Sequence, residues 1–123
     1  MDFDKHRPIY AQVIEQIKLG MTDGTYQPGE SLPSRREIAR QLGINPNTVQ
    51  RAFATLEAEG YITTEKTTVS VVTTDKEKLL ILKKNLLNTA IDQLIETATQ
   101  MTITESEVLL LVEAAYQRRQ QHD

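Results

Sequence analysis

The stretch "GINPNTVQRA", residues 43–52, interrupts an apolar helical pattern with a proline between two asparagines. Gly43 follows Leu42, where a helix that ends needs a residue tolerant of positive φ. Asn45 can cap a new helix, and Pro46 suits the first helical position because an N–H there has no partner within the helix. The stretch therefore predicts one helix that stops at Leu42, a short turn, and a second helix that begins at Pro46.

The two helices on either side of this turn have the residue spacing of a helix-turn-helix. Ser34 caps the first helix, with Glu37 as its expected capping-box partner, and Gly60 ends the second. The apolar residues expected to face inward are Ile38, Ala39 and Leu42 in the first helix and Val49, Ala52, Phe53 and Leu56 in the second. Small residues at the turn allow the close approach that such a motif needs, although a purely structural helical hairpin would share part of this pattern.

The flanking segments extend this motif into a winged helix. Residues 9–21, opened by Pro8, carry apolar side chains at helical spacing, and residues 22–33 form a connector rich in glycine and proline. After the helix-turn-helix, residues 61–74 read "YITTEKTTVSVVTT", with a polar centre at residues 65–68. Threonine and valine favour strands, so this segment predicts a two-stranded hairpin.

Residues 75–123 contain no glycine or proline and predict two further helices. Thr104 and Glu107 form the expected capping box of the second. The first carries a heptad-like apolar seam and an adjacent stripe, which one helix cannot bury alone. The expected dimer interface comprises Leu79, Leu82, Leu86, Leu87, Ile91, Leu94, Ala98, Met101, Leu109 and Val112.

The expected fold is mainly α with a small β-wing, in two parts. Residues 1–74 form a winged helix-turn-helix DNA-binding domain, and residues 75–123 form a two-helix dimerisation tail. A chain of 123 residues is long enough to bury a core without disulfides or a structural metal.

Composition excludes several classes of protein. The chain has no cysteine, and its two histidines lie at opposite ends, so we expect no metal site and no cofactor. No apolar run approaches the roughly 20 residues of a membrane span, and the start lacks a signal peptide. These features predict a cytoplasmic protein without a membrane partner. A hydrolase is disfavoured because no nucleophile with a nearby base, and no paired carboxylates, can be identified.

The first turns of the helix that begins at Pro46 carry side chains suited to reading DNA bases. Asparagine and glutamine can pair with adenine, arginine with guanine, and the threonine methyl can contact that of thymine. These candidates are Asn47, Thr48, Gln50 and Arg51, together with Asn45, although capping alone explains Asn45.

Positive charge gathers in the same region of a chain whose net charge is −3. Arg35, Arg36, Arg40 and Arg51 stand against Glu37 alone. Arg35 and Arg36 fall in the first turn of a helix, where the helix dipole disfavours cations, so we expect at least one of them to contact DNA. A solvated helix face is the alternative interpretation of these charges.

The motifs "PGESLPSRREIARQLG" and "NTVQRAFATLEAEGYI" occur here at the separation that resembles the DNA-binding domain of GntR-family bacterial transcription regulators. The resemblance covers residues 9–62, and "NPNTVQRA" followed by a short helical tail resembles the YtrA-like subfamily. It implies that Arg36 is the arginine after "LPS" that contacts DNA. It also places the residues of the recognition helix at Asn47, Thr48 and Gln50.

The wing departs from the family pattern, which has basic residues and glycines. Thr67 and Val69 stand in place of glycines, and Glu65 is acidic. Because threonine and valine do not permit the close backbone approach that glycine allows, we expect no strong groove contact from the wing. Lys66 is kept as a weak phosphate contact.

Together these features predict a sequence-specific transcriptional regulator, a repressor that binds a palindromic operator in double-stranded DNA as a homodimer. A small-molecule effector of unidentified nature would need a pocket formed between two subunits, since the tail is short. The alternative is a winged-helix adaptor that contacts a protein through its acidic surface without specific DNA binding. That alternative leaves the clustered arginines and the polar edge of the recognition helix without a role.

Overall fold

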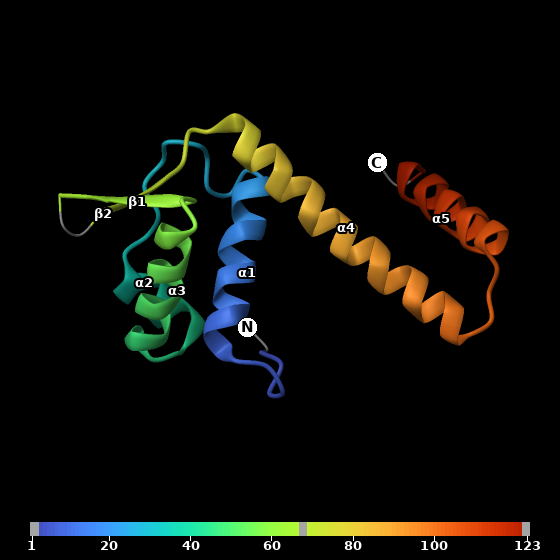
Figure 1. Ribbon diagram of the computed structural model, residues 1–123, viewed down its shortest axis with the longest axis horizontal. Helices are drawn as coiled ribbons and strands as arrows, with labels where there is room; N and C mark the ends of the chain where they lie inside the picture. Colours follow the sequence, from blue (N-terminus) through green and yellow to red (C-terminus); the bar gives the residue numbers. More distant parts are fainter. Residues whose placement is uncertain (1–2, 67–68, 122–123) are drawn as a thin grey trace. The chain divides into compact units, whose positions relative to one another are not determined.

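The computed structural model describes residues 3–66 and 69–121, and over these the mainly α fold with a small β-wing is confirmed (Figure 1). Along the chain the elements are α1 (Ile9–Thr22), α2 (Arg35–Leu42), α3 (Pro46–Ala58), β1 (Ile62–Glu65), β2 (Val69–Val72), α4 (Lys76–Gln100) and α5 (Glu105–Gln120). The chain divides into two compact units, which meet between Lys84 and Asn85 within α4. We call them the head, up to Lys84, and the tail, from Asn85.

The core of the head lies around α3, which packs between α1 and α2 (Figure 1). Val49, Ala52 and Leu56 of α3 have no exposed surface, and Phe53 is also buried. Each large apolar side chain buried in this way stabilises the head by about 1.5–3 kcal/mol. This one-sided burial fixes which edge of α3 is left exposed.

The turn between α2 and α3 forms as its sequence predicts. Gly43 adopts a left-handed conformation with φ of 67°, and the Ile44 N–H donates to the Ala39 carbonyl at 3.0 Å. The Asn45 side chain accepts from the Asn47 N–H at 2.8 Å and so caps α3. A bend of a few residues thus sets the direction of α3 relative to α2.

The capping box predicted for α2 is wrong in one half. The Ser34 hydroxyl accepts from the Glu37 N–H at 3.0 Å, as expected of an N-cap. The Glu37 carboxylate does not return to Ser34, because it accepts hydrogen bonds from Arg40 and Gln41 instead. At the start of α5 both halves are present, since Thr104 and Glu107 bond reciprocally.

The wing is the antiparallel pair β1 and β2, with Ile62 opposite Val72. The connector before α2 runs along the other edge of β2: the Leu32 N–H donates to the Ser70 carbonyl at 2.8 Å. The hairpin is therefore longer than its polar centre indicated, because Glu65 is the last residue of β1 and pairs with Val69. Residues 67–68 lie outside the described residues.

A close approach between α1 and the connector depends on Gly20. A β-carbon built there would lie 2.6 Å from the Tyr26 ring, so a larger residue would force the ring away. The Tyr26 N–H also donates to the Gly20 carbonyl at 2.9 Å. This contact fixes where the connector leaves α1 on its path to α2.

Candidate nucleic-acid interface

The exposed edge of α3 carries most of the predicted reading residues. Asn47, Gln50 and Arg51 are all exposed, and Gln50 and Arg51 follow Asn47 by three and four residues, so both lie next to it on one face of the helix. Thr48 is half-buried beside them, while Val49 is fully buried on the opposite flank. The packing of α3 therefore leaves a polar edge free at its N-terminal end.

Asn45 lies at this end of α3 as well, but its side chain is engaged as the helix cap. Pro46 follows it at the first helical position. The cap satisfies one of the backbone N–H groups that the helix leaves without a partner. The partial positive charge of the remaining N–H groups favours an anion, such as a phosphate, near the start of α3.

The four arginines singled out in the sequence have different surroundings; they are Arg35, Arg36, Arg40 and Arg51. Arg36 is exposed, and among the described residues it takes part in no ion pair. Arg35 is half-buried with its guanidinium carbon 5.0 Å from the centre of the Phe53 ring. Its buried Nε has no hydrogen-bond partner among the described residues. Of the adjacent pair, Arg36 is therefore the better placed to meet an outside anion.

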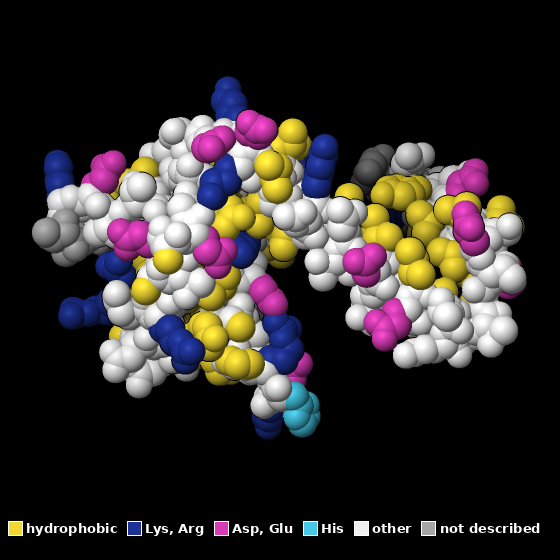
Figure 2. All heavy atoms as spheres, in the orientation of Figure 1, with side chains coloured by type: hydrophobic (Ala, Val, Ile, Leu, Met, Phe, Trp, Pro, Cys, Tyr) yellow, Lys and Arg dark blue, Asp and Glu magenta, His cyan; other side chains and the backbone are white. Residues whose placement is uncertain are grey.

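Arg40 is the arginine whose charge is neutralised on the protein itself. Its Nε lies 3.0 Å from one carboxylate oxygen of Glu37, and its terminal nitrogen lies 2.5 Å from the other. These hydrogen bonds lower the pKa of the Glu37 carboxyl, with a smaller contribution from Gln41. They also raise the pKa of Arg40. Figure 2 shows the positive side chains spread over the head, with acidic side chains between them.

Arg51, on the edge of α3, is held against α1. Its guanidinium carbon lies 3.7 Å from the centre of the Tyr10 ring. The two residues line a groove of about 410 Å³ between the starts of α1 and α3, together with Pro8, Ile9, Asn47 and Thr48. Nothing in the residue pattern of α1 singled out Tyr10, because its ring also fitted the apolar stripe of that helix.

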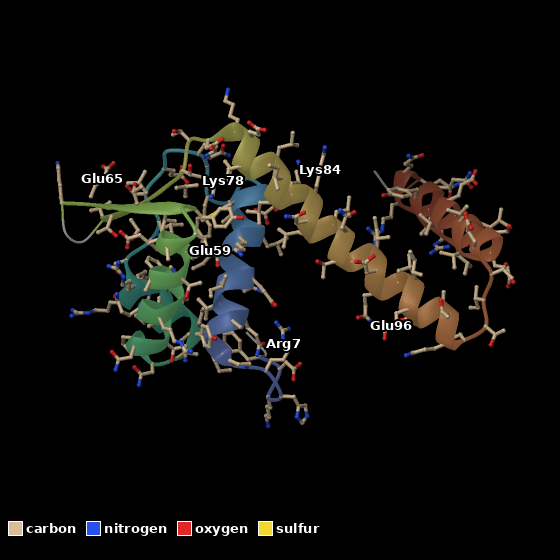
Figure 3. All side chains as sticks on the ribbon, in the orientation of Figure 1. Arg7, Glu59, Glu65, Lys78, Lys84 and Glu96 are labelled. Atoms are coloured by element: carbon tan, nitrogen blue, oxygen red, sulfur yellow. The ribbon has the colours of Figure 1, made fainter. Side chains whose placement is uncertain are left out.

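The wing carries the remaining predicted contact. Lys66 is exposed and follows β1 with φ of 49°, a left-handed conformation unusual for a residue other than glycine. Figure 3 shows its neighbour Glu65 on the wing. Val69, which stands in place of a family glycine, begins β2 and is exposed. Thr67 lies outside the described residues.

Most residues of the predicted dimer interface are not buried within the chain itself. The exposed ones are Leu87, Ile91, Leu94, Met101 and Leu109, and the half-buried ones are Leu79, Leu86 and Val112. Leu82 and Ala98 are already buried within the chain, at 3% and 7% exposure. Four more exposed apolar residues of the tail lie outside the predicted interface, which are Ile95, Leu110, Leu111 and Tyr116. The unbroken run Val108–Val112 was the available signal, since it makes more than one face of α5 apolar.

The tail also contains an apolar groove of about 370 Å³ between α4 and α5. Leu94, Ala98 and Met101 of α4 line it opposite Val108 and Val112 of α5. Figure 2 shows this hollow surrounded by hydrophobic side chains. The two helices of the tail thus do not fill the space between them with their own side chains.

The described residues contain no group of three or more histidine, aspartate or glutamate side chains placed to hold a metal ion. None of the helices in residues 3–66 and 69–121 is long and apolar enough to cross a membrane.

Residues 9–72 match the model of the family described as "Bacterial regulatory proteins, gntR family". The HTH-type transcriptional regulator YhcF of Bacillus subtilis is 30% identical over 87% of this chain and 88% of its own length. The HTH-type transcriptional repressor YtrA of the same organism is 49% identical over 46% of this chain and 44% of its own length.

Two solved structures of DNA-binding regulators are also similar to this chain. A GntR-family transcriptional regulator from Listeria monocytogenes superposes with a TM-score of 0.84 and 32% identity, covering 91% of this chain and 98% of that one. The DNA-binding domain of AraR in complex with operator ORR3 superposes with a TM-score of 0.53 and 25% identity, covering 59% of this chain and 88% of that one.

Proposed function

Since the chain belongs to the GntR family of bacterial regulatory proteins, it is a DNA-binding transcriptional regulator and not an enzyme, and we propose that it represses transcription by binding a palindromic operator as a homodimer. The adaptor alternative is set aside on this ground. A repressor role is supported by the repressor YtrA, which is 49% identical over 46% of this chain. Such a protein acts on the chromosome, so we place it in the cytoplasm.

The single observation that carries this proposal is the exposed polar edge of α3. Asn47, Gln50 and Arg51 are exposed near the N-terminal end of the helix, whose other flank is the core of the head. A helix end of this kind fits the major groove, where amide and guanidinium groups distinguish base pairs by paired hydrogen bonds. We assign base reading to Asn47, Thr48 and Gln50, and phosphate or base contacts to Arg36 and Arg51.

The remaining candidates take smaller parts in this proposal. Asn45 acts by capping the reading helix. Arg35, which stacks on Phe53, is proposed to add positive charge close to the DNA backbone. Lys66 on the wing is proposed as a weak phosphate contact. Binding of a small-molecule effector stays a prediction from the sequence.

The exposed apolar residues of the tail support the proposed homodimer. Exposed apolar patches of this extent are rare on monomeric proteins and mark interaction surfaces. Leu94 and Met101 line the open groove between α4 and α5 and are 43% and 63% exposed, so a second copy that covers this groove would bury them. We therefore propose residues 85–123 as the dimerisation segment, without the already buried Ala98; Leu82, also buried, lies in the head. Two heads joined in this way would read half-sites about 34 Å apart.

The experiment that tests the proposal is selection of bound duplexes from a random pool, followed by binding measurements on the selected site. We expect two related half-sites, and an affinity that falls steeply with salt because phosphate contacts release counterions. Gln50→Ala and Arg36→Ala should each weaken the selected site by about 1–3 kcal/mol and relax its specificity. Gln16→Ala, the same kind of substitution at an exposed glutamine of α1, is the matched control for Gln50→Ala and should bind as wild type. Failure to enrich any duplex, or wild-type binding by both head variants, would contradict the proposal.

A further inference from the structure

Arg51 is exposed on α3 and also contacts the ring of Tyr10. Its guanidinium carbon lies 3.7 Å from the centre of the Tyr10 ring, so the cation covers the face of the ring. Tyr10 is half-buried in the first turn of α1, while Arg51 is exposed on α3. A guanidinium in this position is attracted by the ring face, and its N–H donors, which lie in its own plane, stay available at the rim.

No carboxylate competes for these donors within the described part of the chain. The ion pairs there join Arg7 to Glu15, Lys18 to Glu59 and Arg40 to Glu37. Arg7, which precedes α1 (Figure 3), and Glu15 in the middle of α1 pair with each other. Arg51 is therefore held in place by an aromatic ring while its charge stays available to an outside anion.

The position of this contact points to the anion. The groove of about 410 Å³ that Tyr10 and Arg51 line is also lined by Asn47 and Thr48, two of the proposed base-reading residues. A duplex whose bases meet these two side chains carries its phosphates past the same groove. The start of α1 thus lies beside the proposed reading helix, although nothing in its own sequence suggested a role in recognition.

We propose that Tyr10 is a positioning residue: its ring holds the Arg51 guanidinium in the orientation that meets a DNA phosphate next to the bases read by α3. This inference rests on the proposed function, since it needs a bound duplex. Arginine has a long side chain with many rotamers, and ordering it only upon binding would weaken the complex. A ring that orders it beforehand removes that loss and strengthens binding without itself contacting the DNA.

The test uses the full chain and its selected operator duplex, with four variants measured by fluorescence anisotropy between about 50 and 200 mM salt. Arg51→Ala should weaken binding and reduce the salt slope by about 0.9, the value for one lost phosphate contact. Tyr10→Leu should weaken binding about two- to tenfold, the effect of ordering one long side chain, and should reduce the slope in the same direction. Tyr10→Phe, which keeps the ring and removes the hydroxyl, should bind as wild type.

The fourth variant, Tyr10→Leu with Arg51→Ala, separates positioning from other roles. If Tyr10 acts through Arg51, the double variant should bind no more weakly than Arg51→Ala alone. A further loss in the double variant would overturn the proposal, because Tyr10 would then act on the fold or on DNA by itself. Weak binding by Tyr10→Phe would overturn it in favour of a direct contact by the hydroxyl.

Two more results distinguish this inference from the proposed function. If wild type binds the duplex with a steep salt dependence but Tyr10→Leu binds equally well, the positioning role is wrong and DNA binding stands. If wild type selects no duplex at all, the proposed function itself fails. Thermal unfolding of Tyr10→Leu should match that of Arg51→Ala, whereas a much lower midpoint would indicate a structural role and contradict positioning.

Discussion

In the head, most large apolar side chains of α1 and α3 are covered by their own chain: Val13, Val49 and Leu56 have no exposed surface. In the tail, apolar side chains of similar size are exposed to solvent: Leu110 and Met101 are 66% and 63% exposed. Both units consist largely of helices and both contain a helix with a side-chain N-cap, so local helix chemistry does not separate them. The difference is whether one chain provides both sides of the core.

This difference in burial matches the two roles that we propose, DNA reading by the head and dimerisation by the tail. A reading surface needs a rigid support, and the buried flank of α3 provides it while the other flank stays free. A dimerisation segment needs the reverse, because apolar surface that its own chain covered could not hold a partner. The two units can therefore be perturbed separately, and the following predictions use that separation.

The largest effect is expected in the tail, from Leu94→Lys. In a symmetric dimer the substitution places two lysines in the interface, and an unpaired buried charge costs about 3–5 kcal/mol. Sedimentation should find dimers for wild type and monomers for the variant. Thr89→Lys is the matched control: it is exposed on α4 and, five residues away, faces roughly the other side of the helix. A dimer that survives Leu94→Lys would move the interface elsewhere.

The next effect is expected in the core of the head, from Leu56→Ala. Removing a fully buried leucine leaves a cavity, and we expect a loss of roughly 2–5 kcal/mol in the free energy of unfolding. Urea unfolding followed by circular dichroism measures it. Leu110→Ala, the same substitution at an exposed leucine of α5, should leave the unfolding of the head unchanged. Equal losses from the two variants would remove the distinction between head and tail.

A smaller effect is expected from the cap of α3. Asn45→Ala removes the acceptor of the Asn47 N–H and should lower stability by about 1 kcal/mol. Asn45→Ser restores a capping oxygen, so its thermal midpoint should return close to that of wild type. Because we assign Asn45 to capping, the serine variant should also keep its affinity for the operator. A loss of affinity without a loss of stability would instead make Asn45 a DNA contact.

The smallest effect concerns pH and the pair Glu37 and Arg40. Hydrogen bonds from Arg40 lower the pKa of the Glu37 carboxyl, so the folded state favours its charged form. The resulting stabilisation is present above the usual pKa of a glutamate and is lost as the pH falls through the lowered value. Urea unfolding of wild type and Arg40→Gln should therefore differ slightly at neutral pH and converge once the pH has fallen below the lowered pKa of Glu37. A difference that grows in acid would contradict the pairing.

The sequence predicted the head well because its signals are local. Gly43, Asn45 and Pro46 each occupy a position where backbone chemistry favours one residue type, and the structure confirms all three. The capping box of α2 failed because Arg40, one turn later, competes for the same carboxylate. Such a competition depends on side-chain rotamers, which residue spacing alone does not determine.

The contacts between distant residues could not be predicted in this way. Tyr10 and Arg51 are far apart in the sequence and meet only because α1 packs against α3. Phe53 was expected in the core, yet its ring also supports Arg35, which sets this arginine apart from its neighbour Arg36. In the tail, heptad spacing identified one apolar seam, whereas the exposure of Leu110 and Tyr116 follows from how α5 lies beside α4.

The central claim is that the exposed edge of α3 enters the major groove, and a titration followed by nuclear magnetic resonance tests it most directly. Addition of the selected duplex to the labelled protein should shift the backbone amide signals of residues 47–51 most strongly. The signals of exposed residues in α5 should stay in place. Strong shifts confined to α5, with residues 47–51 unmoved, would contradict the account.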